Sequence, residues 1–318
     1  MLTKREIEQK VNEEYANLRK SAEDKADELL SSLKNNKQFY SNYCKINDTN
    51  YKIAKMGVLH KDTTKETALL AKLTTERQEI LKKLGIPLES LLPHYACQDC
   101  KDTGIYKGHY CNCYKRRLSI EMLKESGINT EELKSMKDFN LNICTDNDKS
   151  HVEYLKKFKA LLTEFASAFP KQKYKNLFIY GPTGVGKTYG LECVTSELIK
   201  KGYFVNFVTA FQLNNIFINY HGSFDKDKQN LLDSLIDPDL LIIDDLGSEP
   251  VFNNITSEYL YLILSERQIK HKSTLISSNC SPKDIFDRYG ERVFSRMFNK
   301  TLTKIFLVDG LDLRLYRK

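Results

Sequence analysis

The residues Leu177-Phe-Ile-Tyr-Gly-Pro-Thr-Gly-Val-Gly-Lys-Thr188 join a short apolar segment to a glycine-rich turn. The apolar part is typical of a buried strand, and a helix-compatible segment follows the turn as far as Lys200. The spacing Gly-x-x-x-x-Gly-Lys-Thr is that of a phosphate loop, in which backbone N–H groups and a helix N-terminus point at phosphate oxygens. Because strand, loop and helix follow in the order that this chemistry needs, the sequence predicts a nucleoside triphosphate site for ATP with Mg²⁺.

The predicted nucleotide contacts are the residues of this loop and the one that follows it. Lys187 is expected to neutralise charge on the β- and γ-phosphates, and the Thr188 hydroxyl is expected to bind Mg²⁺. The full set of predicted contacts is Gly181, Pro182, Thr183, Gly184, Val185, Gly186, Lys187, Thr188 and Tyr189.

Polar side chains end two further apolar segments. Asp244 and Asp245 follow Leu240–Ile243, and Asn279 follows Ser273–Ser278. We expect Asp244 to lie in the Mg²⁺ shell and Asp245 to orient or deprotonate the attacking water. The Asn279 amide is expected to bind the γ-phosphate or the water, although a turn or capping role would also explain an asparagine there.

Apolar segments alternate with helix-length segments from residue 151 onward. Strands are predicted at Leu177–Tyr180, Phe204–Val208, Leu240–Ile243, Thr274–Ser278 and Lys304–Val308. This alternation predicts an α/β fold, a P-loop NTPase whose parallel sheet is covered by helices on both faces.

The N-terminal part is predicted to be helical. Residues 3 to about 33 repeat apolar side chains every three to four positions, which indicates a long amphipathic helix. A polar stretch around Ser41–Asn50 is expected to interrupt the helical pattern, and a second helix is predicted over Lys65–Leu84, ended by Gly85 and Pro87. These helices form a small bundle, a surface for a partner helix, or both.

Four of the eight cysteines form one cluster, Cys97-x-x-Cys100 and Cys111-x-Cys113. This spacing suits tetrahedral Zn²⁺, and four protein ligands would leave no open position for catalysis, so we predict a structural zinc site. Because the second pair is Cys-x-Cys, His109 or His94 could replace one sulfur, and a redox pair is a further alternative. The other cysteines are scattered, which favours reduced thiols over a disulfide framework.

Length and charge suggest two domains and an anionic partner. A chain of 318 residues is long for one domain, and we predict a helical, zinc-containing partner-binding domain over residues 1–140 and an ATPase domain over 141–318. The formal net charge of +7 favours a partner such as nucleic acid, although an ordinary basic surface would also account for it. With no apolar run of membrane-spanning length and a charged N-terminus, we expect a cytoplasmic protein with no membrane partner.

These motifs together resemble the AAA+ ATPases, in particular bacterial helicase loaders of the DnaC/DnaI type and the related IstB transposition helpers. The resemblance rests on the phosphate loop, Asp-Asp-Leu-Gly at 244–247, Ser-Ser-Asn at 277–279 and Gly-Glu-Arg-Val-x-Ser-Arg-Met at 290–297. These segments look like the Walker A, Walker B, sensor 1 and arginine-finger segments of that group, and they cover roughly residues 150–318. Many AAA+ ATPases have Asp-Glu where this chain has Asp244-Asp245, so the resemblance leaves the rate of hydrolysis open.

Two arginine positions follow from the resemblance. Arg292 and Arg296 are four residues apart, hence on one helix face, where they make either surface ion pairs or a contact with a neighbouring subunit's phosphate. The resemblance implies that Arg296 is the arginine finger and Arg292 the alternative, and that Arg314 is a sensor residue at the nucleotide. The segment Pro93–Gly104 is similar to the N-terminal region of the loaders, which carries a zinc site in some members, whereas the IstB-type helpers lack such a segment.

The implied function is a weak, assembly-dependent ATPase that loads the hexameric replicative DNA helicase onto single-stranded DNA. Residues 1–140 would bind the helicase, and the ATP-bound chain would self-associate as a ring or spiral. The eight basic residues from Arg288 to Lys318, against three acidic ones, would suit a DNA backbone. Phe211, Phe217 and Tyr220 are either stacking contacts or, more simply, core residues. The alternatives are a transposition helper and a nucleotide-switched adaptor with little hydrolysis.

Overall fold

The computed structural model of the chain describes residues 4–131, 133–141, 149–224 and 228–315. It divides into two compact units: residues 12–106 form the helical unit, and residues 1–11 together with 107–318 form the sheet unit. The predicted fold class, a parallel α/β sheet preceded by a helical region, is confirmed. Among the described residues, no helix combines the length and the apolar character that a membrane span requires.

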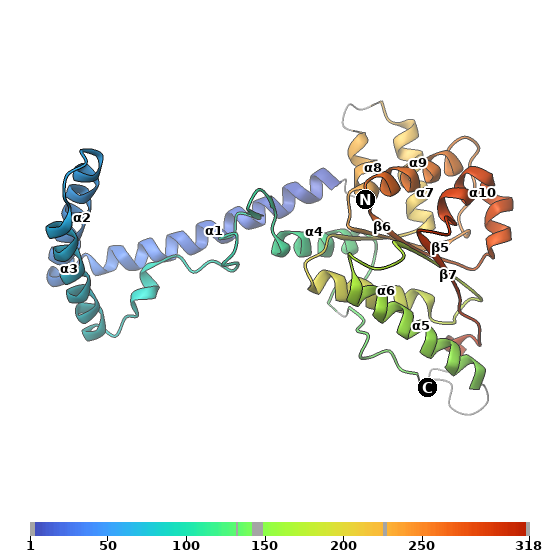
Figure 1. Cartoon of the computed structure of the whole chain (residues 1–318), viewed down its shortest axis with the longest axis horizontal. Coiled ribbons are helices and arrows are strands. Elements are labelled where there is room, and N and C mark those ends of the chain that lie inside the picture. Colours follow the sequence, from blue (N-terminus) through green and yellow to red (C-terminus); the bar gives the residue numbers. More distant parts are fainter. Residues whose placement is uncertain (1–3, 132, 142–148, 225–227, 316–318) are drawn as a thin grey trace. The chain divides into compact units, whose positions relative to one another are not determined.

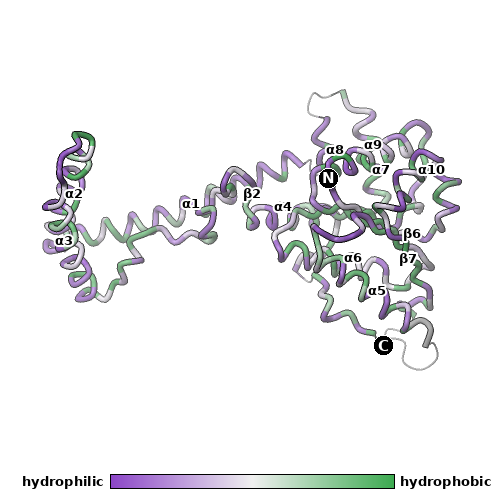
Figure 2. Tube along the Cα trace, in the orientation of Figure 1, coloured by the Kyte–Doolittle hydropathy of each residue, from purple (hydrophilic) through white to green (hydrophobic). Residues whose placement is uncertain are grey.

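The helical unit contains most of α1 (Lys4–Leu33), together with α2 (Lys37–Val58), α3 (Thr64–Lys83) and a short 3-10 helix, Leu88–Leu91. Helices α2 and α3 lie side by side (Figure 1). Figure 2 shows hydrophobic and hydrophilic residues alternating along these helices, as expected of amphipathic helices. The predicted helices at 3–33 and 65–84 are therefore confirmed.

The predicted interruption at Ser41–Asn50 is wrong, because these residues lie inside α2. Asn36 caps the N-terminus of α2: its side-chain oxygen accepts hydrogen bonds from the backbone N–H groups of residues 38 and 39. One of these polar residues, Asn42, is buried with a hydrogen-bond partner, because its Nδ2 donates to the Leu73 carbonyl of α3 at 2.9 Å. Side-chain amides that bond across a helix pair do not show in a hydrophobicity pattern.

The sheet unit is built on five parallel strands in the order β4-β5-β6-β3-β7. Their bounds are β3 Asn176–Tyr180, β4 Val205–Thr209, β5 Leu240–Leu246, β6 Ser273–Ser278 and β7 Thr303–Leu307. Each begins within one residue of its predicted start. The register of β5 against β6 shifts between Ile243 and Leu246, which marks a β-bulge at the end of β5.

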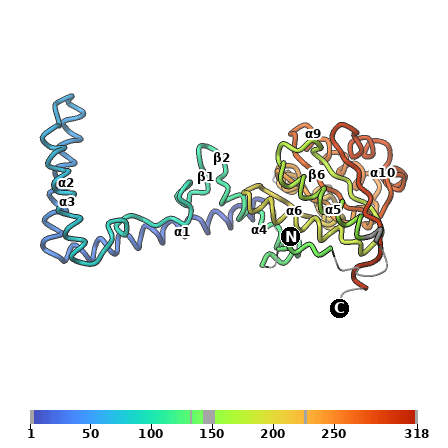
Figure 3. Tube along the Cα trace, turned by 60° about the horizontal axis from the view of Figure 1, so that its bottom comes forward, coloured from blue at the N-terminus to red at the C-terminus, as the bar shows by residue number. Residues whose placement is uncertain are grey.

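Helices cover both faces of this sheet. One face packs against α5 (Lys149–Ala168) and α6 (Lys187–Lys200), which Figure 3 brings toward the viewer. The other face packs against α7 (Ala210–Gly222), α8 (Gln229–Ile236), α9 (Thr256–Ile269) and α10 (Pro282–Met297). Alternate residues of each strand point to opposite faces, so Phe178 and Leu177 belong to different cores. A short 3-10 helix, Leu313–Leu315, ends the described chain.

Helix α4 (Asn112–Glu125), which we did not predict, lies along the outer edge of β4. The Ser119 hydroxyl accepts from the Val205 backbone N–H at 2.9 Å, and the Ser126 hydroxyl donates to the Phe207 carbonyl. These serines form hydrogen bonds with backbone groups of β4 that would otherwise lack a partner, because β4 is an edge strand. Two-residue strands β1 (Ile105–Tyr106) and β2 (His109–Tyr110) precede α4.

The boundaries between the two compact units along the chain do not fall at residue 140. The first turns of α1 belong to the sheet unit, where Lys4 pairs with Asp237 at 2.5 Å and Lys10 pairs with Glu121 at 2.6 Å. Helix α4 belongs to the same unit through its contacts with β4. The division at 140 concerns which part binds a partner, and it stays a prediction.

Candidate nucleotide and metal sites

The phosphate loop connects β3 to α6, as predicted. Gly186 is the residue before the helix and has φ +94°, and Gly184 has φ +81°, so the loop needs glycine at both positions. Gly186 offers no side chain to cap α6, and the first N–H groups of the helix therefore face the loop. This is the geometry in which a helix N-terminus binds phosphate.

The chain segment after β7 lies against this loop. The Leu313 backbone N–H donates to the Gly184 carbonyl at 2.9 Å. A Cβ atom on Gly184 would lie 1.8 Å from Oδ1 of Asp312, and one on Gly181 would lie 1.9 Å from the Val308 carbonyl oxygen. Gly181 is therefore required by a close approach to backbone, whereas the atom near Gly184 belongs to a movable side chain and its positive φ is the stronger constraint. Of residues 308–314, Leu313 and Arg314 line the cavity, and the sequence indicated only Arg314.

Lys187 is buried and holds the loop together. Its ammonium group donates to the carbonyl oxygens of Gly181 at 2.8 Å and Pro182 at 2.7 Å, and to Oδ1 of Asn279 at 2.8 Å. Burial lowers the pKa of Lys187, while Asp245 and Asp244 act in the opposite direction. Two predicted site residues, Lys187 at the start of α6 and Asn279 just after β6, are thus in direct contact.

The two aspartates occupy different surroundings. Asp244 is buried, accepts from the Thr188 hydroxyl at 2.8 Å, and accepts from the Ser277 hydroxyl with its other oxygen. Burial raises the pKa of Asp244 above its ordinary value, and these hydroxyls oppose the rise. Asp245 has φ +59°, a left-handed conformation that is rare outside glycine, and its carboxylate accepts from Nδ2 of Asn279 at 2.6 Å. The structure therefore brings Lys187, Thr188, both aspartates and Asn279 together.

A cavity of about 860 Å³ opens over these residues, within the range of volumes that small-molecule sites have. The phosphate loop, the two aspartates and Asn279 line it, together with side chains that we did not predict to lie at this site. These are Asp138, Phe139, Asn140, Leu155, Thr209, Phe211, Ser248, Ser277 and Leu313. Tyr189 connects the loop to two of them: its hydroxyl donates to the Asp138 carbonyl at 3.1 Å, and its ring lies 5.4 Å from that of Phe139.

Comparisons with known proteins agree with this geometry. A model of the IstB-like ATP binding protein family matches residues 114–302, more than half of the chain. The chain belongs to this family.

Similar proteins include helicase loaders and an insertion-sequence protein. The Replicative helicase loader DnaI of Bacillus subtilis is 29% identical over 129 residues, covering 39% of this chain and 40% of that protein. The Replicative helicase loader DnaC of Buchnera aphidicola is 29% identical over 167 residues, covering 51% and 65%. An ATP-binding protein of insertion sequence IS5376 from Geobacillus stearothermophilus is 31% identical over 149 residues, covering 45% and 57%. The chain thus matches about 40% to 65% of the length of these relatives.

Among solved structures, a crystal structure of DnaI aligns over 59% of this chain and 94% of its own, with 23% identity and a TM-score of 0.44. A crystal structure of the DnaC helicase loader aligns over 54% and 97%, with 23% identity and the same TM-score of 0.44.

The two arginines that follow Gly290 lie within the region of the IstB-like ATP binding family match but outside the lining of the nucleotide cavity. Gly290 breaks α10, with φ +82°, and both arginines belong to the segment after the break. Their guanidinium groups lie over the ring of Tyr261, at 4.3 Å for Arg292 and 5.6 Å for Arg296, which confirms that they share one helix face. Arg292 also pairs with Glu258 at 3.2 Å, so the surface ion-pair interpretation holds for that residue within one chain. Arg314 does line the cavity, and its Nε donates to Oδ1 of Asp312 at 3.1 Å.

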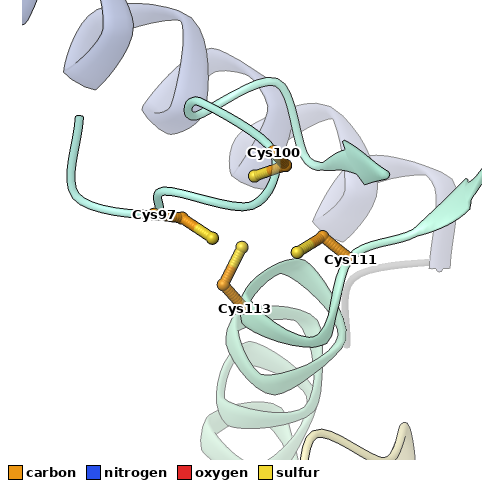
Figure 4. A group of neighbouring side chains, drawn as sticks. All are labelled: Cys97, Cys100, Cys111 and Cys113. Carbon is orange, nitrogen blue, oxygen red and sulfur yellow. The ribbon is translucent and has the colours of Figure 1, made fainter. Parts of the chain in front are cut away.

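The cysteine cluster precedes the region matched by the IstB-like ATP binding family model. The sulfur atoms of Cys97, Cys100, Cys111 and Cys113 all lie within 4.8 Å of one another, and Figure 4 shows the four side chains converging. Among the described residues, the metal-competent cluster consists of these four cysteines and includes neither His94 nor His109. Four sulfur donors at this separation suit tetrahedral Zn²⁺.

The Asp102 carboxylate supports the first cysteine pair. It is buried and accepts from the backbone N–H groups of Ala96 and Cys97, each at 2.8 Å. We did not predict a role for Asp102, because a carboxylate in a cysteine-rich turn resembles an ordinary surface acid in the sequence.

Two of the three aromatic residues of α7 that we considered pack against other residues of the same chain. Phe217 is buried in the core, and the ring of Tyr220 lies 5.3 Å from that of Tyr259. Phe211 is 58% exposed and lines the nucleotide cavity, so the core-packing expectation is wrong for this residue, which stays a candidate for contact with a ligand.

Proposed function

We propose that the sheet unit binds ATP with Mg²⁺ and hydrolyses it. The observation that carries the proposal is the contact of Lys187 with Asn279, and of Thr188 with Asp244, inside one cavity. The paired oxygens of Thr188 and Asp244 are the kind of ligand that Mg²⁺ takes beside phosphate. Mg²⁺ would neutralise phosphate charge there, Lys187 would bind the β- and γ-phosphates, and Asp245 would orient the attacking water.

The apolar residues of the cavity are suited to the base. Phe139, Leu155 and Leu313 offer apolar surface in its lining. Replacing Phe139 with alanine should weaken ATP binding roughly tenfold, since an aromatic contact of this kind contributes about 1 kcal/mol or more. Inorganic triphosphate, which has no base, should bind both proteins equally.

The nucleotide site is tested by Lys187→Ala, with Lys200→Ala as the matched control. Lys200 lies on the same helix but at its far, exposed end, and is not among the residues that line the cavity. Lys187→Ala should abolish binding of a fluorescent ATP analogue in an anisotropy titration, and Lys200→Ala should bind as the wild type does. Equal ATP affinity in both variants would refute the site.

We propose further that hydrolysis needs a second copy of the chain. Arg314 lines the cavity of its own chain, whereas Arg292 and Arg296 are exposed and do not, so as arginine fingers they would act on the site of a neighbouring copy. Mixing the Arg296→Ala and Lys187→Ala chains, each inactive alone, should restore part of the phosphate release, because one mixed interface joins an intact site to an intact arginine. If Arg296→Ala alone keeps its phosphate release, whereas Arg292→Ala loses it and recovers part of it on mixing with Lys187→Ala, Arg292 is the finger.

For the whole chain we propose ATP-dependent loading of a hexameric replicative DNA helicase onto single-stranded DNA. Residues 1–140 would bind the helicase, and residues 141–318 would couple the nucleotide state to opening of the helicase ring and its placement on single-stranded DNA. Support comes from the two relatives named replicative helicase loaders and from the four-cysteine segment that lies ahead of the matched family region. We propose that this segment binds Zn²⁺ and resembles the N-terminal region of the loaders.

Co-purification tests this function directly. The full chain should retain the replicative helicase from the same organism, and native mass measurement should give a different stoichiometry with ATP and with ADP. Single-stranded DNA should bind in the presence of ATP, and Phe211→Ala should weaken that binding if the exposed ring stacks on a base.

A transposition helper is the second candidate, favoured by the similarity to the insertion-sequence protein. That function predicts tight binding to duplex DNA and no retention of the helicase. A nucleotide-switched adaptor, the third candidate, would bind the helicase but release no phosphate in steady state, with or without single-stranded DNA.

A further inference from the structure

The end of strand β5 is irregular where the two aspartates lie. The β-bulge between Ile243 and Leu246 interrupts the ladder with β6, and Asp245 has φ +59°. A left-handed aspartate is strained, and a bulge removes backbone partners, so this arrangement needs support from neighbouring groups.

Two consecutive serines of β6 provide that support. The Asp245 backbone N–H donates to Oγ of Ser277 at 2.8 Å, and the Ser278 hydroxyl donates to the Leu246 carbonyl. Each hydroxyl thus replaces one ladder bond that the bulge removes. Both serines are almost completely buried, with 1% and 0% of their surface exposed, so water cannot take over either role.

Only one of these serines also touches a carboxylate. The Ser277 hydroxyl donates to Oδ1 of Asp244, whose other oxygen accepts from Thr188. Ser278 instead accepts from the backbone N–H of Cys280 at 2.9 Å. A hydroxyl can donate one hydrogen bond and can also accept one. The Ser277 hydroxyl donates its hydrogen bond to the Asp244 carboxylate and accepts one from the Asp245 backbone N–H.

We infer that Ser277 is a positioning residue for both acidic groups of the site: it orients the Asp244 carboxylate toward the metal beside Thr188, and it holds Asp245 in its left-handed conformation toward the γ-phosphate side. This inference rests on the proposed Mg²⁺-ATP site. It predicts that losing the hydroxyl harms the use of Mg²⁺ more than the binding of the nucleotide itself, which Lys187 and the loop backbone govern.

The test compares Ser277→Ala, Ser277→Thr and the matched control Ser278→Ala. Binding of a fluorescent ATP analogue is titrated at increasing Mg²⁺, binding without Mg²⁺ is measured in EDTA, and phosphate release gives the rate. Ser277→Ala should raise the Mg²⁺ concentration for half-maximal binding and lower the rate by about tenfold each, the size expected for a lost hydrogen bond to a charged group. Affinity in EDTA should change by less than about twofold, and Ser277→Thr, which keeps the hydroxyl, should restore both values.

Ser278→Ala separates positioning from packing, because it removes an equally buried hydroxyl from the same bulge. It should melt at a lower temperature, as Ser277→Ala does, but keep the wild-type dependence on Mg²⁺. If Ser277→Ala fails to fold, Ser277→Cys keeps the side-chain volume with a much weaker hydrogen bond and should show the same Mg²⁺ defect.

Two results would be decisive against the inference. Ser277→Ala or Ser277→Cys with wild-type Mg²⁺ dependence, and only the thermal loss seen in Ser278→Ala, would show that Ser277 merely packs the bulge and would leave the proposed ATP site intact. A wild-type chain whose nucleotide binding ignores Mg²⁺ would overturn the metal site and the inference together.

Discussion

Replacing Asp244 with asparagine should stabilise the protein at neutral pH while it removes a carboxylate of the proposed Mg²⁺ site. Asp244 is 6% exposed, and burial raises the pKa of its carboxyl above 3.8 despite the hydroxyls of Thr188 and Ser277. An ionised carboxylate at such a position costs several kcal/mol to desolvate. Its two hydroxyl bonds return about 1.5–3 kcal/mol each when charged, and about 1 kcal/mol each to a neutral amide. Because the pKa remains raised, desolvation outweighs the bonds, and the neutral side chain should be more stable by on the order of 1 kcal/mol.

The pH dependence gives the sign of this effect independently. A carboxyl whose pKa is raised on folding binds its proton more tightly in the folded chain, so stability falls as pH rises from 3.8 through the folded pKa. The advantage of Asp244→Asn should therefore be full at pH 7.5 and shrink toward zero near pH 4.

Thermal unfolding without nucleotide or Mg²⁺ is the assay. An increase of 1 kcal/mol corresponds to roughly 2–4 °C for a unit of this size. Asp245→Asn is the control, because Asp245 is only half-buried and its carboxylate accepts from Asn279. It should not gain stability. In addition, Mg²⁺-ATP should raise the melting temperature of the wild type but not of Asp244→Asn. An Asp244→Asn chain that is less stable than the wild type at pH 7.5, or equally shifted at both pH values, would refute the reasoning.

Three further outcomes are expected. Cys100→Ser should abolish stoichiometric zinc in metal analysis of the purified chain and expose residues 93–111 to limited proteolysis, whereas Cys44→Ser, outside the cluster, should change neither. Arg267→Met should cost at least about 3 kcal/mol in denaturant unfolding, because this fully buried side chain donates to four backbone carbonyls and one hydroxyl that would lose their partner. Glu249→Gln and Tyr289→Phe should each lower the melting temperature by a few degrees, and the double variant should lose less than the sum, because the Tyr289 hydroxyl donates to the buried Glu249 carboxylate.

The parts of the site that were predictable from sequence are those attached to the ends of strands. Each of β3, β5 and β6 is an apolar run followed at once by its functional residues, and parallel strands place their carboxyl ends at one edge of the sheet. Lys187, Asp244 and Asn279 were therefore assigned correctly to one place without knowledge of any contact. The four cysteines were predictable for a similar reason, since metal ligands must come in close pairs along the chain.

The missed residues lack such an anchor in the sequence. Phe139 and Leu313 belong to segments outside the sheet. Only the folded chain shows that both line the same cavity. Helix α4 was not predicted, because its buried side mixes apolar residues such as Leu118 and Met122 with the buried polar residues Ser119 and Glu121. No separate role was predicted for Ser277, because a serine inside a strand indicates nothing special until the bulge opposite it is known.

Asp244 and Ser277 share one hydrogen bond, yet their replacements are expected to change stability in opposite directions. The carboxylate is the group that burial penalises, and the hydroxyl is one of the groups that makes its burial tolerable. Removing the penalty stabilises the fold, whereas removing the compensation leaves a buried charge with one partner fewer. In the double variant Asp244→Asn, Ser277→Ala, the hydroxyl no longer has a charge to satisfy, so its loss should cost less than in the wild type. A loss of the same size in both backgrounds would mean that Ser277 supports only the Asp245 backbone, because that contact is unchanged by the amide.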